Sequence, residues 1–187
     1  MLEFREQIEK EVPRDDAADF GEQMILYSLI RAIKPNIVVE VGTHKGMTSL
    51  YMAHALYDNG IGVLHTCDPF EWGQQGNFRK FPELEKLIKF YPIKGEELDV
   101  DEIDILFLDG YHEYEYVERE LKHFIPRLSE KGIIIFHDCK GDKPGGEVGV
   151  NTAIRDAGLS TVLIPTENYI RIYCKDDDIN LYSNNKT

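Results

Sequence analysis

The chain has 187 residues, of which 42% are hydrophobic, and its formal net charge is −13. This length suits one globular domain with a single sizeable core. The acidic balance and the absence of Lys and Arg clusters argue against nucleic-acid binding, because neutralising phosphates requires such clusters.

The elements predicted from the sequence follow the alternating pattern of an α/β protein. Residues 1–20 are charged and weakly patterned, and they predict an N-terminal extension made of a short helix and a loop. From residue 21 onward, amphipathic segments alternate with apolar runs, which is typical of a doubly wound, mostly parallel sheet. The predicted helices cover residues 21–33, 47–57, 83–90, 113–128 and 147–157. The predicted strands cover residues 37–41, 62–68, 91–95, 103–109 and 132–138, and a closing antiparallel hairpin covers 161–164 and 169–175.

Three segments are expected to lack regular structure. Residues 69–82 and 139–146 have the composition of loops, and their glycines would permit lid motion over a site. The polar tail, 176–187, is expected to fray. No composition shift marks a linker, so residues 1–187 predict a single domain.

The cysteines and the N-terminus indicate a cytoplasmic protein. Cys67, Cys139 and Cys174 are odd in number and widely spaced, which argues against a disulfide framework and favours a reducing compartment. The N-terminus lacks the apolar core of a signal peptide. No apolar run approaches the roughly 18 residues of a membrane span, so no membrane partner is expected.

The first predicted strand ends in a turn with two glycines, Gly42 and Gly46. Glycine lets a backbone turn tightly and approach a ligand closely, and the following helix presents unpaired N–H groups. The spacing Gly-x-x-x-Gly differs from that of dinucleotide sites and of Walker loops, so the turn is also compatible with a simple connection. Asp68, at the end of the second strand, can accept hydrogen bonds from ribose hydroxyls or form a turn before Pro69.

Two further strands end in an acidic residue with a histidine nearby. The fourth ends at Asp109, three residues before His112, and the fifth ends in His137 and Asp138. A helix between them makes the two strands parallel neighbours, so both ends lie at the sheet edge where α/β proteins bind ligands. These four residues are therefore the best candidates for chemistry. The alternatives are a helix-start residue for His112 and a structural hydrogen bond for His137.

The helix between these two strands carries a row of acidic residues, Glu113, Glu115, Glu118 and Glu120. Acidic side chains are favourable in the first turn of a helix and in pairs along its exposed surface. This row therefore predicts a solvated face rather than a site.

The glycine turn and Asp68 resemble the cofactor site of class I S-adenosylmethionine (SAM)-dependent methyltransferases. Glu40-x-Gly42-x-x-x-Gly46 is similar to the first motif of that family, and Asp68 is similar to its ribose-binding acid. The resemblance implies that Glu40 approaches the amino group of the methionine moiety, that Asp68 holds the ribose, and that Glu96 lies near the adenine. It also implies a Rossmann-like seven-stranded sheet in the order 3-2-1-4-5-7-6, with strand 7 antiparallel.

The two Asp–His segments resemble the small-molecule O-methyltransferase branch related to macrolide-sugar and cephalosporin-tailoring enzymes. The resemblance implies a magnesium site of acidic residues at these strand ends. The carboxylates of Asp109 and Asp138 and the imidazole of His137 could hold a divalent metal, Mg or Mn. Asp109 and His112 are the expected catalytic residues, His112 as a general base because its ordinary pKa is about 6.5. His137 stands where some relatives carry a carboxylate, and an imidazole ligand would shift the preference towards manganese, iron or zinc. A metal or a positioned base would promote ionisation of an acceptor hydroxyl.

The predicted function is O-methylation of a small hydroxylated metabolite or sugar, with SAM as cofactor. A homodimer is compatible with a compact domain of this kind. One alternative is a protein of the same sheet class that binds NAD or another nucleotide, and another is a protein that keeps the fold without catalysis. N-methylation, which needs no metal, also remains open.

Overall fold

The computed structural model describes residues 2–15, 17–140 and 149–175. Its strands are β1 (Ile37–Val41), β2 (Val63–Cys67), β3 (Ile88–Tyr91), β4 (Ile103–Leu108), β5 (Leu128–Phe136), β6 (Thr161–Ile164) and β7 (Ile170–Cys174). Its α-helices are α1 (Leu2–Glu11), α2 (Phe20–Ile33), α3 (Met47–Asn59), α4 (Gln74–Phe78), α5 (Pro82–Glu85), α6 (Tyr114–Phe124) and α7 (Val150–Asp156). Two 3-10 turns, η1 (Gly95–Glu97) and η2 (Ile125–Arg127), complete the set.

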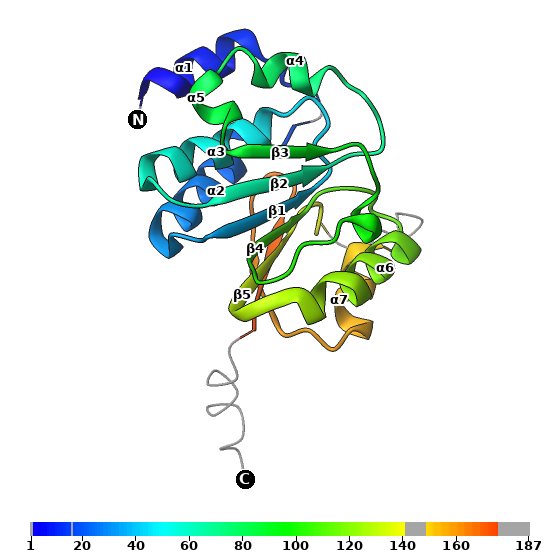
Figure 1. Cartoon of the computed structure of the whole chain (residues 1–187). Helices are drawn as coiled ribbons and strands as arrows, with labels where there is room; N and C mark the ends of the chain where they lie inside the picture. The colour runs from blue at the N-terminus through cyan, green and yellow to red at the C-terminus, as the bar shows by residue number, and fades with distance from the viewer. Residues whose placement is uncertain (1, 16, 141–148, 176–187) are drawn as a thin grey trace.

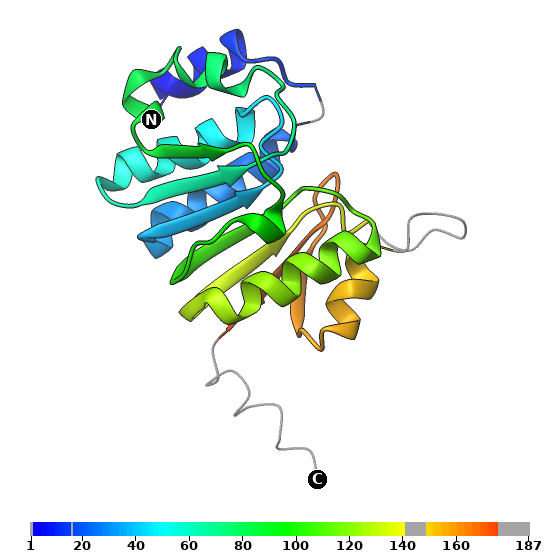
Figure 2. The same ribbon diagram turned by 45° about the vertical axis from the view of Figure 1, so that its right-hand side comes forward.

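The strands form one sheet in the order β3-β2-β1-β4-β5-β7-β6, with helices on both faces (Figures 1 and 2). Strands β1 to β5 are parallel, whereas β7 pairs antiparallel with β5 and with β6. The predicted strand order and the antiparallel seventh strand are confirmed. No helix in the described ranges is long and apolar enough to cross a membrane.

Residues of the central strands alternate between two hydrophobic layers. Val39 and Leu106 belong to the layer that α6 and α7 cover, and Val38 and Phe107 belong to the layer under α2 and α3. Because both faces of the sheet are buried, these strands are continuous apolar runs in the sequence. The N-terminal extension packs against the domain, since Ile8 of α1 lies in a buried cluster with residues of α3, α4 and α5.

Two predicted elements are wrong in position. Strand β3 runs from Ile88 to Tyr91 rather than over 91–95, and the helix predicted over 83–90 is only the short α5. Strand β3 pairs with β2 from Leu64↔Ile88 onward, and Pro92 follows at its end. Proline cannot donate a ladder hydrogen bond, so it ends this edge strand instead of lying within it.

Smaller differences occur elsewhere. Helix α4 interrupts the loop predicted over 69–82. The helix predicted over 113–128 ends at Phe124, because Pro126 lies in η2 and the chain enters β5 directly afterwards. Most of the predicted lid over 139–146, and the whole tail over 176–187, lie outside the described residues.

Candidate active site

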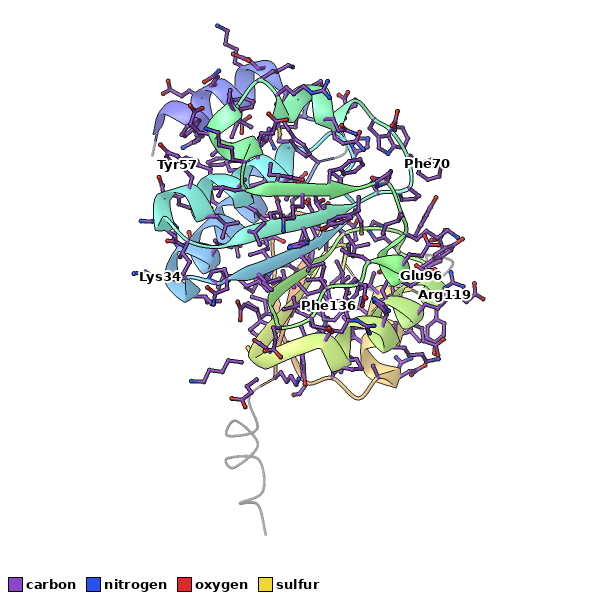
Figure 3. The ribbon with its side chains drawn as sticks, in the orientation of Figure 1. Lys34, Tyr57, Phe70, Glu96, Arg119 and Phe136 are labelled. Atoms are coloured by element: carbon purple, nitrogen blue, oxygen red, sulfur yellow. The ribbon has the colours of Figure 1, made fainter. Side chains whose placement is uncertain are left out.

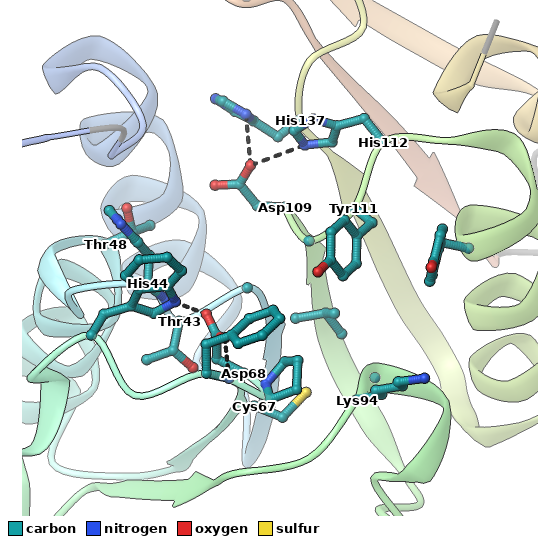
Figure 4. Close-up of a pocket in the computed structure, with 18 of the residues that line it drawn as sticks. Thr43, His44, Thr48, Cys67, Asp68, Lys94, Asp109, Tyr111, His112 and His137 are labelled. Atoms are coloured by element: carbon teal, nitrogen blue, oxygen red, sulfur yellow. Dashed lines mark hydrogen bonds and ion pairs between the residues drawn. The ribbon is translucent and has the colours of Figure 1, made fainter. Parts of the chain in front are cut away.

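The carboxyl ends of β1, β2, β4 and β5 border one cavity of about 470 Å3, a size typical of small-molecule sites (Figure 4). Asp68 directly follows β2, and the segment after β3 closes the far side. All but one of the sequence-predicted site residues line this cavity, namely Gly42, Gly46, Asp68, Glu96, Asp109, His112, His137 and Asp138.

The glycine turn brings β1 close to the end of β4. Gly42 has a φ of +96°, and a Cβ atom there would overlap the carbonyl oxygen of Asp109. Gly46 caps α3 in a left-handed conformation without a side-chain hydrogen bond to the first turn. The unpaired N–H groups at the start of α3 thus lie at the cavity, where they suit a negatively charged ligand group.

Asp68 is buried and fixed by backbone donors. Its Oδ2 accepts a hydrogen bond from the N–H of His44 at 2.8 Å, and its Oδ1 accepts one from the N–H of Phe70 at 2.9 Å. These bonds set the orientation of a carboxylate that lines the cavity. Each oxygen keeps acceptor capacity for a ligand hydroxyl.

Glu40 is the predicted site residue that does not line the cavity. Its side chain is fully buried behind the glycine turn and accepts hydrogen bonds from the hydroxyls of Ser49 and Thr66. Burial raises the pKa of Glu40 to about 8, despite these two hydrogen bonds. Glu40 therefore supports the turn from behind as a neutral carboxyl group at pH 7.

The Asp–His cluster consists of Asp109, His112, His137 and Asp138. One ligand atom of each residue lies within 4.8 Å of those of the others. Asp109 Oδ1 is 2.8 Å from His137 Nδ1 and 3.7 Å from His112 Nε2 (Figure 4). His112 Nε2 also lies 3.2 Å from Asp138 Oδ2. The expectation that the two strand ends meet at a common edge is confirmed.

Glu22, in the first turn of α2, supports this cluster from behind, and it is not among the sequence-predicted site residues. It is 1% exposed, and its Oε2 lies 2.8 Å from His137 Nε2. The same carboxylate accepts hydrogen bonds from the hydroxyl of Thr166 and the backbone N–H of Asn168. The only sequence signal is the spacing Asp19-x-x-Glu22 of a capping box, which marks a helix start and does not reveal its distant partner.

The charges within the cluster balance one another. Burial alone would lower the pKa of His137, but the carboxylates of Asp109, Asp138 and Glu22 raise it to about 12. Burial would raise the pKa of Asp109, yet His137 and His112 lower it below the ordinary value. Burial alone would lower the pKa of His112, but Asp109 and Asp138 raise it above its ordinary value. The carboxylates thus require a positive charge between them, and the His137 imidazolium supplies it.

The same donor set fits a divalent metal ion. Asp109 and Asp138 offer carboxylate oxygens, and His137 offers an imidazole nitrogen. The hydrogen bond from His137 Nε2 to Glu22 directs Nδ1 towards the cluster, which is how outer carboxylates orient metal-binding histidines.

The cavity has further lining residues outside the predicted set, and the expectation for one of them, Glu120, is wrong. The sequence predicts a solvated face for Glu120, but this side chain is 4% exposed and lines the cavity. Its position in the i, i+3, i+4, i+7 stripe formed with Val117, Leu121 and Phe124 is the signal that could have identified it. The remaining lining residues with polar or aromatic side chains include Thr48, Lys94, Tyr111 and Tyr116.

Solved structures of methyltransferases share this fold. The SAH-bound methyltransferase PaMTH1 of Podospora anserina has a TM-score of 0.71 and 18% identity, over 94% of this chain and 87% of that chain. A putative O-methyltransferase from Klebsiella pneumoniae has a TM-score of 0.71 and 17% identity, over 94% and 87% of the two chains. The O-methyltransferase TomG of Streptomyces achromogenes, solved with SAM, has a TM-score of 0.62 and 17% identity, over 87% and 82%.

Sequence comparison gives the family. An uncharacterized protein of Sinorhizobium fredii, y4gI, is 22% identical over 127 residues, which are 60% of this chain but only 14% of that protein, so this chain spans a small part of its length. The family model described as a methyltransferase domain matches residues 39–139, more than half of the chain. This match runs from β1 through the glycine turn and Asp109 to the His137–Asp138 pair. The chain therefore belongs to the methyltransferase domain family.

Proposed function

We propose that this protein is a SAM-dependent O-methyltransferase that acts on a small hydroxylated molecule. The observation that carries this proposal is a single cavity in which the glycine turn and Asp68 adjoin the Asp–His cluster. Methyl transfer requires a donor and an activated nucleophile held at adjoining positions. The structural relatives solved with SAH or SAM support the choice of cofactor.

The cofactor half of the cavity suits the parts of SAM. Asp68, oriented by two backbone N–H groups, would accept hydrogen bonds from the ribose hydroxyls. The start of α3, with Thr48 in its first turn, suits the methionine carboxylate. Glycine at positions 42 and 46 lets the backbone approach the ligand. We expect Glu40 to act indirectly, by fixing this turn.

His112 is the proposed general base. Its Nε2 makes no hydrogen bond with a described residue, although it lies at ion-pair distance from Asp109 and Asp138. In the proposed reaction His112 takes the proton of the acceptor hydroxyl, whose oxygen bonds to the methyl carbon while the bond from that carbon to sulfur breaks. The two aspartates then stabilise the protonated imidazole. A divalent ion held by Asp109, His137 and Asp138 would supply Lewis acidity that lowers the pKa of the hydroxyl.

The acceptor has room next to the cluster on the side of α1. A second hollow, lined by residues that include Arg5, Arg14 and Phe20, shares Ala17 and Asn168 with the main cavity. Such adjoining space suits an acceptor larger than a simple diol.

The test is methyl transfer from labelled SAM to a panel of hydroxylated acceptors that includes catechol, caffeate and a free sugar. We expect label on a hydroxyl oxygen, and we expect His112→Gln to lower kcat by about 100-fold or more, because positioned bases typically contribute that much. SAH affinity, measured by calorimetry, should stay near the wild-type value in this variant. Glu118→Gln, on the outer face of α6, is the matched control and should keep full activity. Absence of SAH binding, or binding of NAD instead, would overturn the proposal.

The metal part of the proposal has its own test. We expect Mn2+ to bind the wild-type protein, as measured by electron paramagnetic resonance, and we expect Asp109→Asn and Asp138→Asn to weaken that binding strongly. Removal of metal with EDTA should reduce turnover, and Mg2+ or Mn2+ should restore it. Full turnover in EDTA would show that the His137 imidazolium serves in place of a metal.

A further inference from the structure

Glu120 presents a buried carboxyl group to the cavity wall beside Gly95 and Gly110. It is 4% exposed, lines the cavity from α6, and makes no hydrogen bond or ion pair with another residue in the described ranges. Buried polar side chains are nearly always hydrogen-bonded, because leaving them unpaired is costly. An unpaired carboxyl group of this kind at a cavity wall points to a ligand.

Two glycines keep the space in front of this carboxyl group open. A Cβ atom on Gly95 would lie 3.0 Å from Glu120 Oε1, and one on Gly110 would lie 3.5 Å from it. The same two positions would contact Val41 Cγ1 at 2.9 Å and 3.1 Å. This part of the cavity wall therefore places the Glu120 carboxyl group next to the apolar side chain of Val41. A flat ring whose edge carries polar atoms matches such a surface.

The protonation state of Glu120 determines which polar atoms on the edge of a ligand ring it can bind. Burial and the Glu96 carboxylate raise the pKa of Glu120 to about 8, although His112 and Arg119 act in the opposite direction. Arg119 pairs with Glu96 at 3.4 Å (Figure 3), and Glu120 makes no ion pair with any residue that the structure describes. At pH 7 the carboxyl group is neutral, so it offers one O–H donor and one carbonyl acceptor side by side.

Glu120 lies beside Gly95, and the strand order indicates that the base of the cofactor would extend towards this segment. The Asp–His cluster follows β4 and β5, Asp68 follows β2, and Gly95 follows β3. A donor with its sulfonium beside the cluster and its ribose at Asp68 extends its base towards η1 and α6. Figure 4 shows Asp109 in the upper part of the close-up, and Asp68 and Lys94 in its lower part.

We propose that Glu120 recognises the adenine of SAM, donating its O–H to a ring nitrogen and accepting a hydrogen bond from the exocyclic amino group. This inference rests on the proposed function and assigns base recognition to a residue of α6. Glu96, paired with Arg119, then has a lesser part in binding the base.

The test compares SAH binding by calorimetry with thermal unfolding of the free protein. We expect Glu120→Leu to weaken SAH binding by about tenfold or more, the usual effect of losing a hydrogen-bonded partner. The same variant should unfold at a higher temperature, because a buried, unpaired carboxyl group is removed. Opposite changes in affinity and stability distinguish a ligand contact from a structural role. Glu120→Gln, which keeps a donor and an acceptor, should bind SAH within about threefold of wild type.

A second ligand makes the test specific for the base. The SAH analogue with purine in place of adenine lacks the amino group, so it should bind the wild-type protein more weakly than SAH does. Glu120→Leu should bind SAH and this analogue equally. Should that variant fail to fold, equal binding of the two ligands by wild type would overturn the inference. If Glu120→Leu binds SAH as tightly as wild type does, the inference about Glu120 is wrong while the proposed function stands. If the wild-type protein does not bind SAH, both the inference and the proposed function are wrong.

Discussion

Gly42 shows how much of this site depends on a single backbone position. Its φ of +96° belongs to the left-handed region, and the place of its missing Cβ is taken by the backbone of Asp109. The close approach of β1 and β4 at this point sets the glycine turn against the Asp–His cluster. One residue thus couples the proposed cofactor site to the proposed reaction centre.

Alanine at Gly42 should therefore be far more disruptive than alanine at a glycine that differs only in its surroundings. Gly60 also has a positive φ, 68°, but nothing lies within 4 Å of its Cβ position. Gly60→Ala should cost about 1–2 kcal/mol of the free energy of unfolding, from backbone conformation alone. Gly42→Ala adds overlap with backbone atoms and should cost about 3 kcal/mol or more. Urea unfolding measures both, and equal losses would contradict the close approach.

Residues within a motif could be predicted from the sequence, but residues held by distant partners could not. Gly42, Asp68 and Asp109 end strands at recognisable spacings, and the structure places all three at one cavity. Glu22 lies 115 positions from His137, and no local pattern links the two. Glu120 was misjudged because acidic residues are common on solvated helix faces, although its place in the apolar stripe indicated burial.

The start of α2 connects three elements of the fold. Glu22 accepts a hydrogen bond from the backbone N–H of Asp19 at 3.0 Å, which caps the helix. The same side chain holds His137, after β5, and Asn168, between β6 and β7. The capping residue Glu22 thus also connects α2, through hydrogen bonds, to the antiparallel end of the sheet.

Separate substitutions can distinguish the capping of α2 from the contacts that Glu22 makes with distant residues. Asp19→Ala removes only capping hydrogen bonds and should cost about 1 kcal/mol. Glu22→Ala also leaves the His137 imidazolium without one of its carboxylates, and loss of one partner of a buried ion pair typically costs about 3–5 kcal/mol. Thermal unfolding gives the comparison, and kcat should fall only in Glu22→Ala. Similar effects of the two substitutions would mean that Glu22 acts as a cap alone.

At the scale of elements, the long apolar runs were the most predictable part of the chain. Strands buried on both faces carry a strong signal, and the alternation with helices dictated a parallel sheet. The edge strand β3 was misplaced because its sequence, Ile-Lys-Phe-Tyr, is short and contains a charged residue. The predicted strand 91–95 includes the neighbouring Pro92, which instead lies just after the end of β3.

Across the whole molecule, acidic side chains outnumber basic ones, 34 Asp and Glu against 21 Lys and Arg. With fewer basic than acidic side chains, buried carboxyl groups compete for the available cations. Asp109 and Glu22 share the His137 imidazolium, whereas Glu40 and Glu120 pair with no cation in the described ranges, and the pKa of each is raised to about 8. The fold therefore holds two neutral glutamic acids beside a strongly charged cluster.

These two protons should make stability depend on pH in a particular direction. The pKa of Glu40 and that of Glu120 rise from 4.5 to about 8 on folding. Between these values the folded protein binds protons that the unfolded chain releases. The free energy of unfolding therefore falls as pH rises, by at most about 1.4 kcal/mol per pH unit for each group. The Glu40→Gln, Glu120→Gln double variant should lose this dependence between pH 5.5 and 8.

Urea unfolding of both proteins across that range measures the effect. His137, with its raised pKa, also lowers stability as pH rises above 6.5, but it is common to both proteins. The difference between the two curves therefore reports only the glutamic acids, and it should widen steadily with pH in favour of the double variant. Parallel curves would show that Glu40 and Glu120 are ionised in the folded protein, and each would then need a cation that the described part of the chain does not provide.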